Sequence, residues 1–146
     1  MQLLILACSQ TKSELGKPLP AKELYTGVFY SVLNKAIREN STINDKLSLY
    51  IISAKYGLIS GEAEIENYDL RMTDKIAKLQ IDNNTRILHK IIAETNPSEI
   101  MLVMGRTYRS SIDTSNIRIP VNKITGSIGF MLRDFKVWLS SLEGCL

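Results

Sequence analysis

The chain has 146 residues, of which 45% are hydrophobic and 23% charged, and its formal net charge is +3. These values are typical of a globular domain and exclude a disordered, fibrous or low-complexity protein. No apolar stretch approaches the roughly 20 residues that a membrane-spanning helix needs, and the N-terminus lacks the basic lead of a signal peptide. We therefore expect one soluble, cytoplasmic domain over residues 1–146, with no membrane partner.

The first half of the chain predicts two strands and a helix. The apolar run 3–8 is typical of a buried central strand, and the polar stretch 9–20 reads as a loop because glycine and prolines interrupt it. Apolar residues at helical spacing predict a helix over 24–37. A second β-prone run covers 47–54, and a loop is expected from Gly57 to about Arg71.

The second half alternates helices and strands. In chain order we expect a helix over 73–95, a strand over 99–104, a short helical stretch near Tyr108, a strand over 117–121 and a helix after 126–129. Thr73 is a suitable N-cap for the long helix and Pro97 must end it. Pro120 places the strand over 117–121 near a sheet edge. This alternation predicts an α/β fold: a three-layer sandwich whose central, mostly parallel sheet of about four strands is flanked by helices.

Sheets of this kind bind ligands at the carboxyl ends of their strands. The three loops that follow the predicted strands begin with Cys8, Ser9 and Lys12, with Ser53 and Lys55, and with Gly105 and Arg106. Each loop therefore carries a small residue and a cation. Cations on converging loops suit an anionic ligand such as a phosphate or a carboxylate.

Two residues near these loops have both a catalytic and a structural interpretation. Cys8 is either a buried small hydrophobic residue or a nucleophile whose pKa Lys12 or Lys55 would lower. Asp69, which a tyrosine and a leucine flank, is either a general base or cation-stabilising carboxylate, or a residue bonded to loop backbone or paired with Lys55. His89 lies inside the predicted long helix and is expected to be a partly exposed helical residue rather than a base.

The sequence predicts neither a cofactor nor a metal site. The stretch 126–129 could cradle a phosphate at a helix start or simply cap the helix, and it fits neither the P-loop nor the dinucleotide pattern. One histidine and two distant cysteines, Cys8 and Cys145, cannot form a metal site, although carboxylates could hold Mg²⁺. The charge balance is +3 over 1–60, −3 over 61–105 and +4 over 106–136. The two basic segments could face phosphates or be ordinary solvated faces.

Four short motifs follow one another in the first half of the chain. They are Cys8-Ser9-Gln10-Thr11-Lys12, Leu24-Tyr25-Thr26-Gly27, Ser53-Ala54-Lys55-Tyr56-Gly57-Leu58 and Tyr68-Asp69-Leu70. In this order and spacing, across residues 3–72, the sequence resembles a family of small α/β proteins of bacteria, archaea and phages. It is also similar to the uracil-DNA-glycosylase-like domain of archaeosine synthase. The resemblance implies a three-layer α/β fold and nucleobase or nucleic-acid chemistry, without the transglycosylase barrel and PUA module that the full archaeosine reaction uses.

We therefore expect an enzyme that acts on a nucleobase, a nucleotide or a nucleic acid by glycosidic or base-modification chemistry. The expected catalytic residues are Asp69, Lys55 and Cys8, and the expected substrate-binding residues are Ser9, Lys12, Tyr25, Ser53, Tyr68, Gly105 and Arg106. The alternative is a non-catalytic module that binds nucleic acid or a nucleotide within a modification or phage-defence system. A purely structural or partner-binding domain would leave the cations at the strand ends unexplained.

Overall fold

The computed structural model describes residues 1–9, 12 and 16–143. In this part of the chain five strands form a mixed sheet in the order β4-β3-β1-β6-β7. The central strand β1 (Gln2–Ala7) pairs in parallel with β3 (Leu47–Ser53) and β6 (Glu99–Val103). Strand β7 (Val121–Ile124) runs parallel to β6, and β4 (Gly57–Ser60) runs antiparallel to β3.

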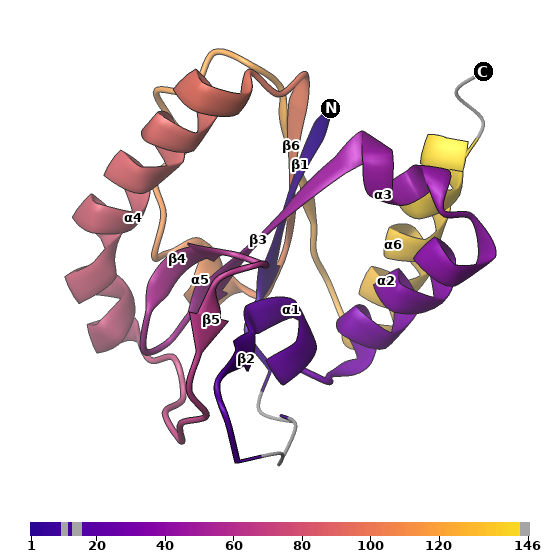
Figure 1. Cartoon of the computed structure of the whole chain (residues 1–146). Helices are drawn as coiled ribbons and strands as arrows, with labels where there is room; N and C mark the ends of the chain where they lie inside the picture. Colours follow the sequence, from indigo (N-terminus) through magenta and orange to yellow (C-terminus); the bar gives the residue numbers. More distant parts are fainter. Residues whose placement is uncertain (10–11, 13–15, 144–146) are drawn as a thin grey trace.

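Helices cover both faces of this sheet, which makes the three layers visible in Figure 1. One face carries α1 (Ala21–Leu24), α2 (Val28–Glu39), α3 (Thr42–Lys46) and α6 (Ile128–Glu143), and the other carries α4 (Asp74–Thr95) and α5 (Arg106–Arg109). Leu4 and Leu6 of β1 belong to the core under the first group, while Leu3 and Ile5 belong to the core under the second. Burial on both faces explains why β1 is continuously apolar. The predicted α/β sandwich is confirmed, with one strand more than the four expected.

The ends of the long helix follow the sequence signals. The Thr73 hydroxyl accepts a hydrogen bond from the N–H of Ile76 at 3.2 Å, as an N-cap does. At the other end Asn96 adopts the left-handed conformation, with φ 47°, directly before Pro97. The helix predicted over 73–95 is therefore confirmed as α4.

The two segments predicted as loops contain strands. Within 57–71 lie β4 and β5 (Glu64–Ile65), and β5 pairs with β2 (Leu19–Pro20), which lies at the end of the other predicted loop. The loop prediction failed because Gly57 was read as a breaker, whereas it closes a hairpin opposite Ser53. Its φ of +74° is a turn conformation that favours glycine.

The helix predicted over 24–37 forms only from Val28 on, as α2, and its first residue, Leu24, belongs to the separate α1. Helix α1 ends at Leu24, Tyr25 has extended backbone, and α2 begins after Gly27. A Cβ on Gly27 would lie 2.7 Å from the Cβ of Ser9, so the absence of a side chain allows this close approach. The short α3, which contains one buried apolar residue, was not predicted.

The strand predicted over 117–121 is wrong and is replaced by β7, which starts where the prediction ended. Pro120 has no N–H for a sheet ladder. Its carbonyl instead accepts a hydrogen bond from the N–H of Ile100 at 2.9 Å. The half-buried Ile117 and Ile119 pack against the core on the α4 side, which explains their apolar character without a strand.

Three residues of the sequence analysis, Gln10, Thr11 and Cys145, lie outside the described residues. Among the residues that the structure does describe, no helix combines the length and the apolar character that crossing a bilayer requires. His89 is exposed on α4, as its position in the helix predicted.

Candidate active site at the carboxyl edge of the sheet

Residues from all four motifs meet where β1 and β3 end. Because these strands are parallel neighbours, Cys8, which follows β1, lies beside the end of β3, and its N–H donates to Ile52 at 2.9 Å. The backbones of Lys12 and Tyr25 form an isolated β-bridge. The N–H of Gly27 donates to the Ser9 hydroxyl at 3.3 Å. The order of the motifs therefore reflects one cluster in space.

Three hydroxyl groups form a hydrogen-bonded chain at the centre of the cluster. The Tyr68 oxygen lies 2.7 Å from the Ser53 oxygen and 2.6 Å from the Tyr25 oxygen. The buried Ser53 oxygen also accepts from the N–H groups of Lys55 at 3.2 Å and Tyr56 at 3.1 Å. Since its lone pairs are thus engaged, Ser53 donates its own hydrogen to Tyr68, and Tyr68 donates to Tyr25.

Two further tyrosine hydroxyls lie at the end of β1, one beside Cys8 and one beside Ala7. The Cys8 sulfur lies 3.0 Å from the hydroxyl oxygen of Tyr108, which α5 carries at the end of β6. The neighbouring carbonyl of Ala7 accepts from the Tyr30 hydroxyl at 2.6 Å. Cys8 is half-buried and packs against both hydrophobic cores. Cys8 therefore packs as the small hydrophobic residue that the sequence allowed, and its sulfur also lies beside the Tyr108 hydroxyl.

Two lysines place positive charge over the tyrosine rings. The Lys12 ammonium lies 4.6 Å from the ring centroid of Tyr68. The Lys55 ammonium lies 5.3 Å from the centroid of Tyr56 and 6.0 Å from that of Tyr68. These distances are within the range of cation–π attraction. We call the set of Cys8, Lys12, Tyr25, Ser53, Lys55, Tyr56, Tyr68 and Tyr108 the tyrosine cluster.

Burial raises the pKa of three tyrosines of this cluster and of the neighbouring Tyr30. Loss of solvent contact raises the pKa of Tyr25 to about 12. Burial also raises the pKa of Tyr68, with the hydrogen bond to Tyr25 acting in the same direction, and that of Tyr108, with the bond to Cys8 adding to it. The pKa of Tyr30 is raised by burial as well. At neutral pH these four side chains are hydrogen-bond donors, not phenolates.

This protonation predicts an unusual alkaline titration. Because the folded pKa of Tyr25 lies above the ordinary value near 10, the unfolded chain loses the proton first, and the free energy of unfolding should fall as pH rises from about 10 to 12. At pH 11 Tyr25, Tyr30, Tyr68 and Tyr108 should contribute little phenolate absorbance to the folded protein, and most of their signal should appear on unfolding. Absorbance from four or more tyrosines in the folded state would contradict the buried network.

The turn that carries Ser53 and Lys55 is held from α4. Gln80 donates through its amide to the carbonyls of Ser53 and Ala54, both at 3.0 Å. Asn84, fully buried, accepts from the N–H of Leu58 at 2.9 Å. The amide of Asn84 donates to Gln80 and to the carbonyl of Ser111, each at 3.1 Å. The sequence analysis missed these two polar helix residues, because only the fold shows which side of α4 faces the turn.

The remaining predicted site residues lie outside the tyrosine cluster. Asp69 is exposed, and in the described part of the chain it forms no ion pair with Lys55. Gly105 is the exposed N-cap of α5. The exposed Arg106 lines a separate cavity of about 540 Å³ between α4 and α5. The structure thus brings together the strand-end residues Cys8, Ser9, Lys12, Ser53 and Lys55 with the motif tyrosines Tyr25 and Tyr68, while Asp69, Gly105 and Arg106 lie outside the cluster.

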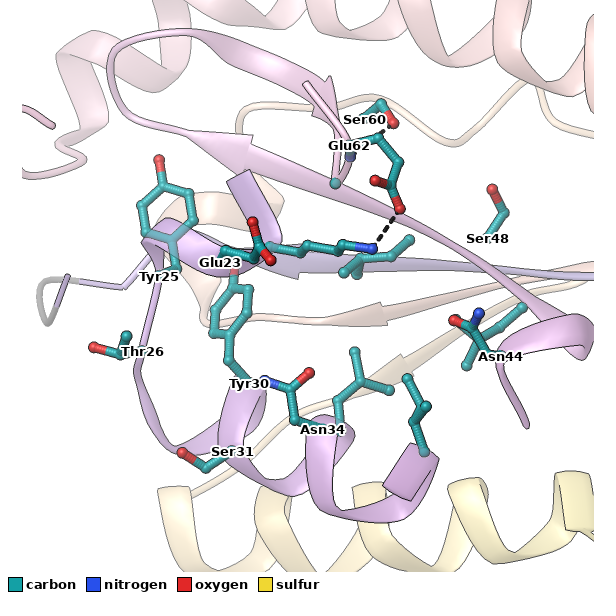
Figure 2. Close-up of a pocket in the computed structure, with 16 residues that line it drawn as sticks. Glu23, Tyr25, Thr26, Tyr30, Ser31, Asn34, Asn44, Ser48, Ser60 and Glu62 are labelled. Atoms are coloured by element: carbon teal, nitrogen blue, oxygen red, sulfur yellow. Dashed lines mark hydrogen bonds and ion pairs between the residues drawn. The ribbon is translucent and has the colours of Figure 1, made fainter. Parts of the chain in front are cut away.

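A larger groove of about 720 Å³ adjoins the cluster on the α2 side of the sheet (Figure 2). Tyr25 and Tyr30 line it, as do the ion-paired Lys22 and Glu62, whose contact of 2.6 Å is the dashed line in Figure 2. Its polar lining is mostly uncharged, and includes Ser31, Asn34, Asn44, Ser48 and Ser60. The groove therefore shares Tyr25 with the tyrosine cluster, but its lysine, Lys22, is paired with Glu62 and Glu23 adds a second carboxylate, so it does not favour an anion.

The described residues contain no group of three His, Cys, Asp or Glu side chains placed to hold a metal ion. The stretch 126–129 begins α6, where the carbonyl of Ser127 accepts from the N–H of Met131 at 2.9 Å. The side chains that meet in the tyrosine cluster carry hydroxyl, thiol and ammonium groups.

The chain matches a known protein family. The sequence model of a protein family covers residues 3–131, a range that includes all four motifs, and the family is described as a family of unknown function, DUF6884. No curated protein gives a significant match to the chain. These findings give no support to a relationship with the uracil-DNA-glycosylase-like domain of archaeosine synthase.

Proposed function

The chain belongs to the DUF6884 family, and for this member we propose an enzyme that acts on a nucleobase or nucleotide at the tyrosine cluster. The observation that carries the proposal is the meeting of two lysines, four tyrosines, Ser53 and Cys8 at the carboxyl ends of β1 and β3. This is the edge where sheets of this type bind their ligands. The resemblance of the four motifs to the archaeosine synthase domain suggests the same class of substrate.

Each part of a nucleotide has a matching group in this proposal. The ammonium groups of Lys12 and Lys55 would attract the phosphate. The half-buried ring of Tyr56 offers a face or an edge to a base. Tyr25 accepts from Tyr68, so its own hydrogen would be the one that stabilises negative charge developing on a base carbonyl or ring nitrogen. Asp69, outside the cluster, would serve as the base or as the carboxylate that stabilises a sugar cation.

The placement of Asp69 supports a second candidate, a module that binds a nucleotide without changing it. A general base must come within hydrogen-bond reach of the proton that it removes. Asp69 is exposed and stands apart from the hydroxyl chain of Tyr68, Tyr25 and Ser53. Under this alternative the lysines and tyrosines would recognise the ligand, and no product would form.

Two substitutions test the enzymatic proposal. Lys55→Ala and Asp69→Asn should each reduce turnover at least about tenfold, which corresponds to roughly 1.4 kcal/mol of lost transition-state stabilisation. Because both side chains are exposed, the melting temperature should change by less than about 2 °C. The measurement is mass spectrometry of nucleosides, nucleotides and oligonucleotides incubated with the protein, which detects a released base or a base of altered mass.

The matched control is Lys35→Ala, which removes an exposed lysine that α2 carries away from the cluster. Its turnover should equal that of the parent protein. If the parent protein binds nucleotides but yields no altered product, the binding module replaces the enzyme. A large fall in melting temperature for Lys55→Ala would show a structural residue and contradict the assignment of Lys55 to the site.

A further inference from the structure

A second group of cations lies across the central strand from Lys55. The cavity of about 540 Å³ between α4 and α5 is lined by Lys78, Arg106, Thr107, Ser110 and Asp74. Lys78 and Arg106 are exposed, and in the described part of the chain neither has an ion-pair partner. The two cations outnumber the single carboxylate of Asp74, so the cavity favours an anion.

Helix α5 connects this cavity to the tyrosine cluster. The helix has four residues, Arg106–Arg109. Tyr108 reaches the sulfur of Cys8 at 3.0 Å, and Arg109 donates to the carbonyl of Met104 at 2.7 Å, which fixes the helix to the end of β6. Arg106 and Thr107, on the preceding positions, line the cavity. A ligand group in the cavity would therefore lie close to one in the cluster.

The order of the strands places the two cationic positions on opposite sides of Cys8. Lys55 follows β3 and Arg106 follows β6, while Cys8 follows β1, which lies between those strands. The ends of β3 and β6 are two strand spacings apart, roughly 10 Å. A mononucleotide with one phosphate would engage one side, whereas a strand offers a phosphate on each side of a nucleoside.

We propose that the substrate is a single strand of nucleic acid, held by Lys78 and Arg106 through one backbone phosphate and by Lys12 and Lys55 through another, with a nucleoside between them at the tyrosine cluster. This rests on the proposed function and names its substrate class. Thr107 lines the same cavity and supplies a hydroxyl for a phosphate oxygen. The shared ligand chemistry is the phosphodiester, which DNA and RNA both provide.

The test compares oligonucleotides with mononucleotides on the Lys78→Gln/Arg106→Gln double variant. Fluorescence anisotropy with labelled single-stranded DNA and RNA should show at least about tenfold weaker binding than for the parent protein. The slope of log affinity against log salt should become shallower by up to about 1.4, since each phosphate contact on a single strand contributes roughly 0.7. The affinity of the double variant for a nucleoside monophosphate should stay within about twofold of that of the parent protein.

Lys90→Gln provides the matched control, because Lys90 is an exposed lysine near the other end of α4. Its affinity for the oligonucleotides should equal that of the parent. Unchanged oligonucleotide affinity and salt slope in the double variant would overturn the strand proposal, as would a parent protein that binds mononucleotides but no oligonucleotide. In either case the proposed function would survive if the parent still alters a nucleotide and Lys55→Ala does not, so the two failures are distinguishable.

Discussion

Asn84→Ala should lower the free energy of unfolding by about 3 kcal/mol. The side chain is fully buried, and its loss leaves the N–H of Leu58 and the carbonyl of Ser111 without their partner. It also leaves a small cavity under the turn that carries Ser53 and Lys55. Urea denaturation measures the stability, and faster hydrogen exchange at the Leu58 amide would show that the turn itself has loosened.

The adjacent Asn83 is the matched control for this substitution. It is exposed on the same helix, and its side chain accepts only from Arg86, at 2.5 Å, among the bonds that the structure describes. Asn83→Ala should therefore cost less than about 0.5 kcal/mol. If the two alanine variants were equally stable, Asn84 would not hold the β3–β4 turn, and the positioning of Lys55 would need another cause.

Tyr68→Phe should lower the free energy of unfolding by about 2 kcal/mol, although the ring is kept. Ser53 loses the acceptor of its hydrogen and the buried Tyr25 oxygen loses its donor, so two polar groups with little access to water are left unpaired. Under the proposed function, turnover or nucleotide binding should fall with the same substitution. Urea denaturation gives the fraction of the variant that is folded. Turnover in the product assay is then expressed per folded molecule, which separates loss of stability from loss of activity.

Tyr56→Phe tests whether any tyrosine hydroxyl near the site has this effect. Its hydroxyl reaches the carbonyl of Glu66 only at 3.4 Å, and it takes no part in the chain from Ser53 to Tyr25. We expect a cost below about 0.5 kcal/mol. A Tyr68→Phe protein as stable as this control would contradict the hydroxyl chain.

The parts of the fold that the sequence predicted are those with strong local signals. Strand β1 is apolar at every position between Leu3 and Leu6 because both its faces are buried, and α4 has both a capping threonine and a terminating proline. Strands β4 and β5 were missed because they are short, and because β4 begins at Gly57 and is followed by Gly61, glycines that also mark loops. Gly61 is needed for a different reason: a Cβ there would lie 3.1 Å from the side chain of Leu49.

The candidate site was predicted in part for a physical reason. The carboxyl ends of parallel strands lie together whatever the loops do, so Cys8 and Ser53 could be placed from strand order alone. The partners that depend on helix orientation could not. Tyr30 faces the end of β1 from within α2, and Gln80 faces the turn from within α4. Tyr108 lies shortly after the predicted strand over 99–104, and this position is the sequence signal that could have placed it beside Cys8.

The central position of β1 also determines when the sheet can be completed as the chain is made. Gln2 pairs with both Leu47 and Glu99. Strand β1 is synthesised before both of its neighbours, and its pairing with β6 requires a segment made about one hundred residues later. At roughly 5–20 residues per second, translation leaves β1 without its β6 neighbour for several seconds. During that interval the apolar run from Leu3 to Leu6 has an open edge. It is the segment of the nascent chain where chaperone binding or aggregation should begin.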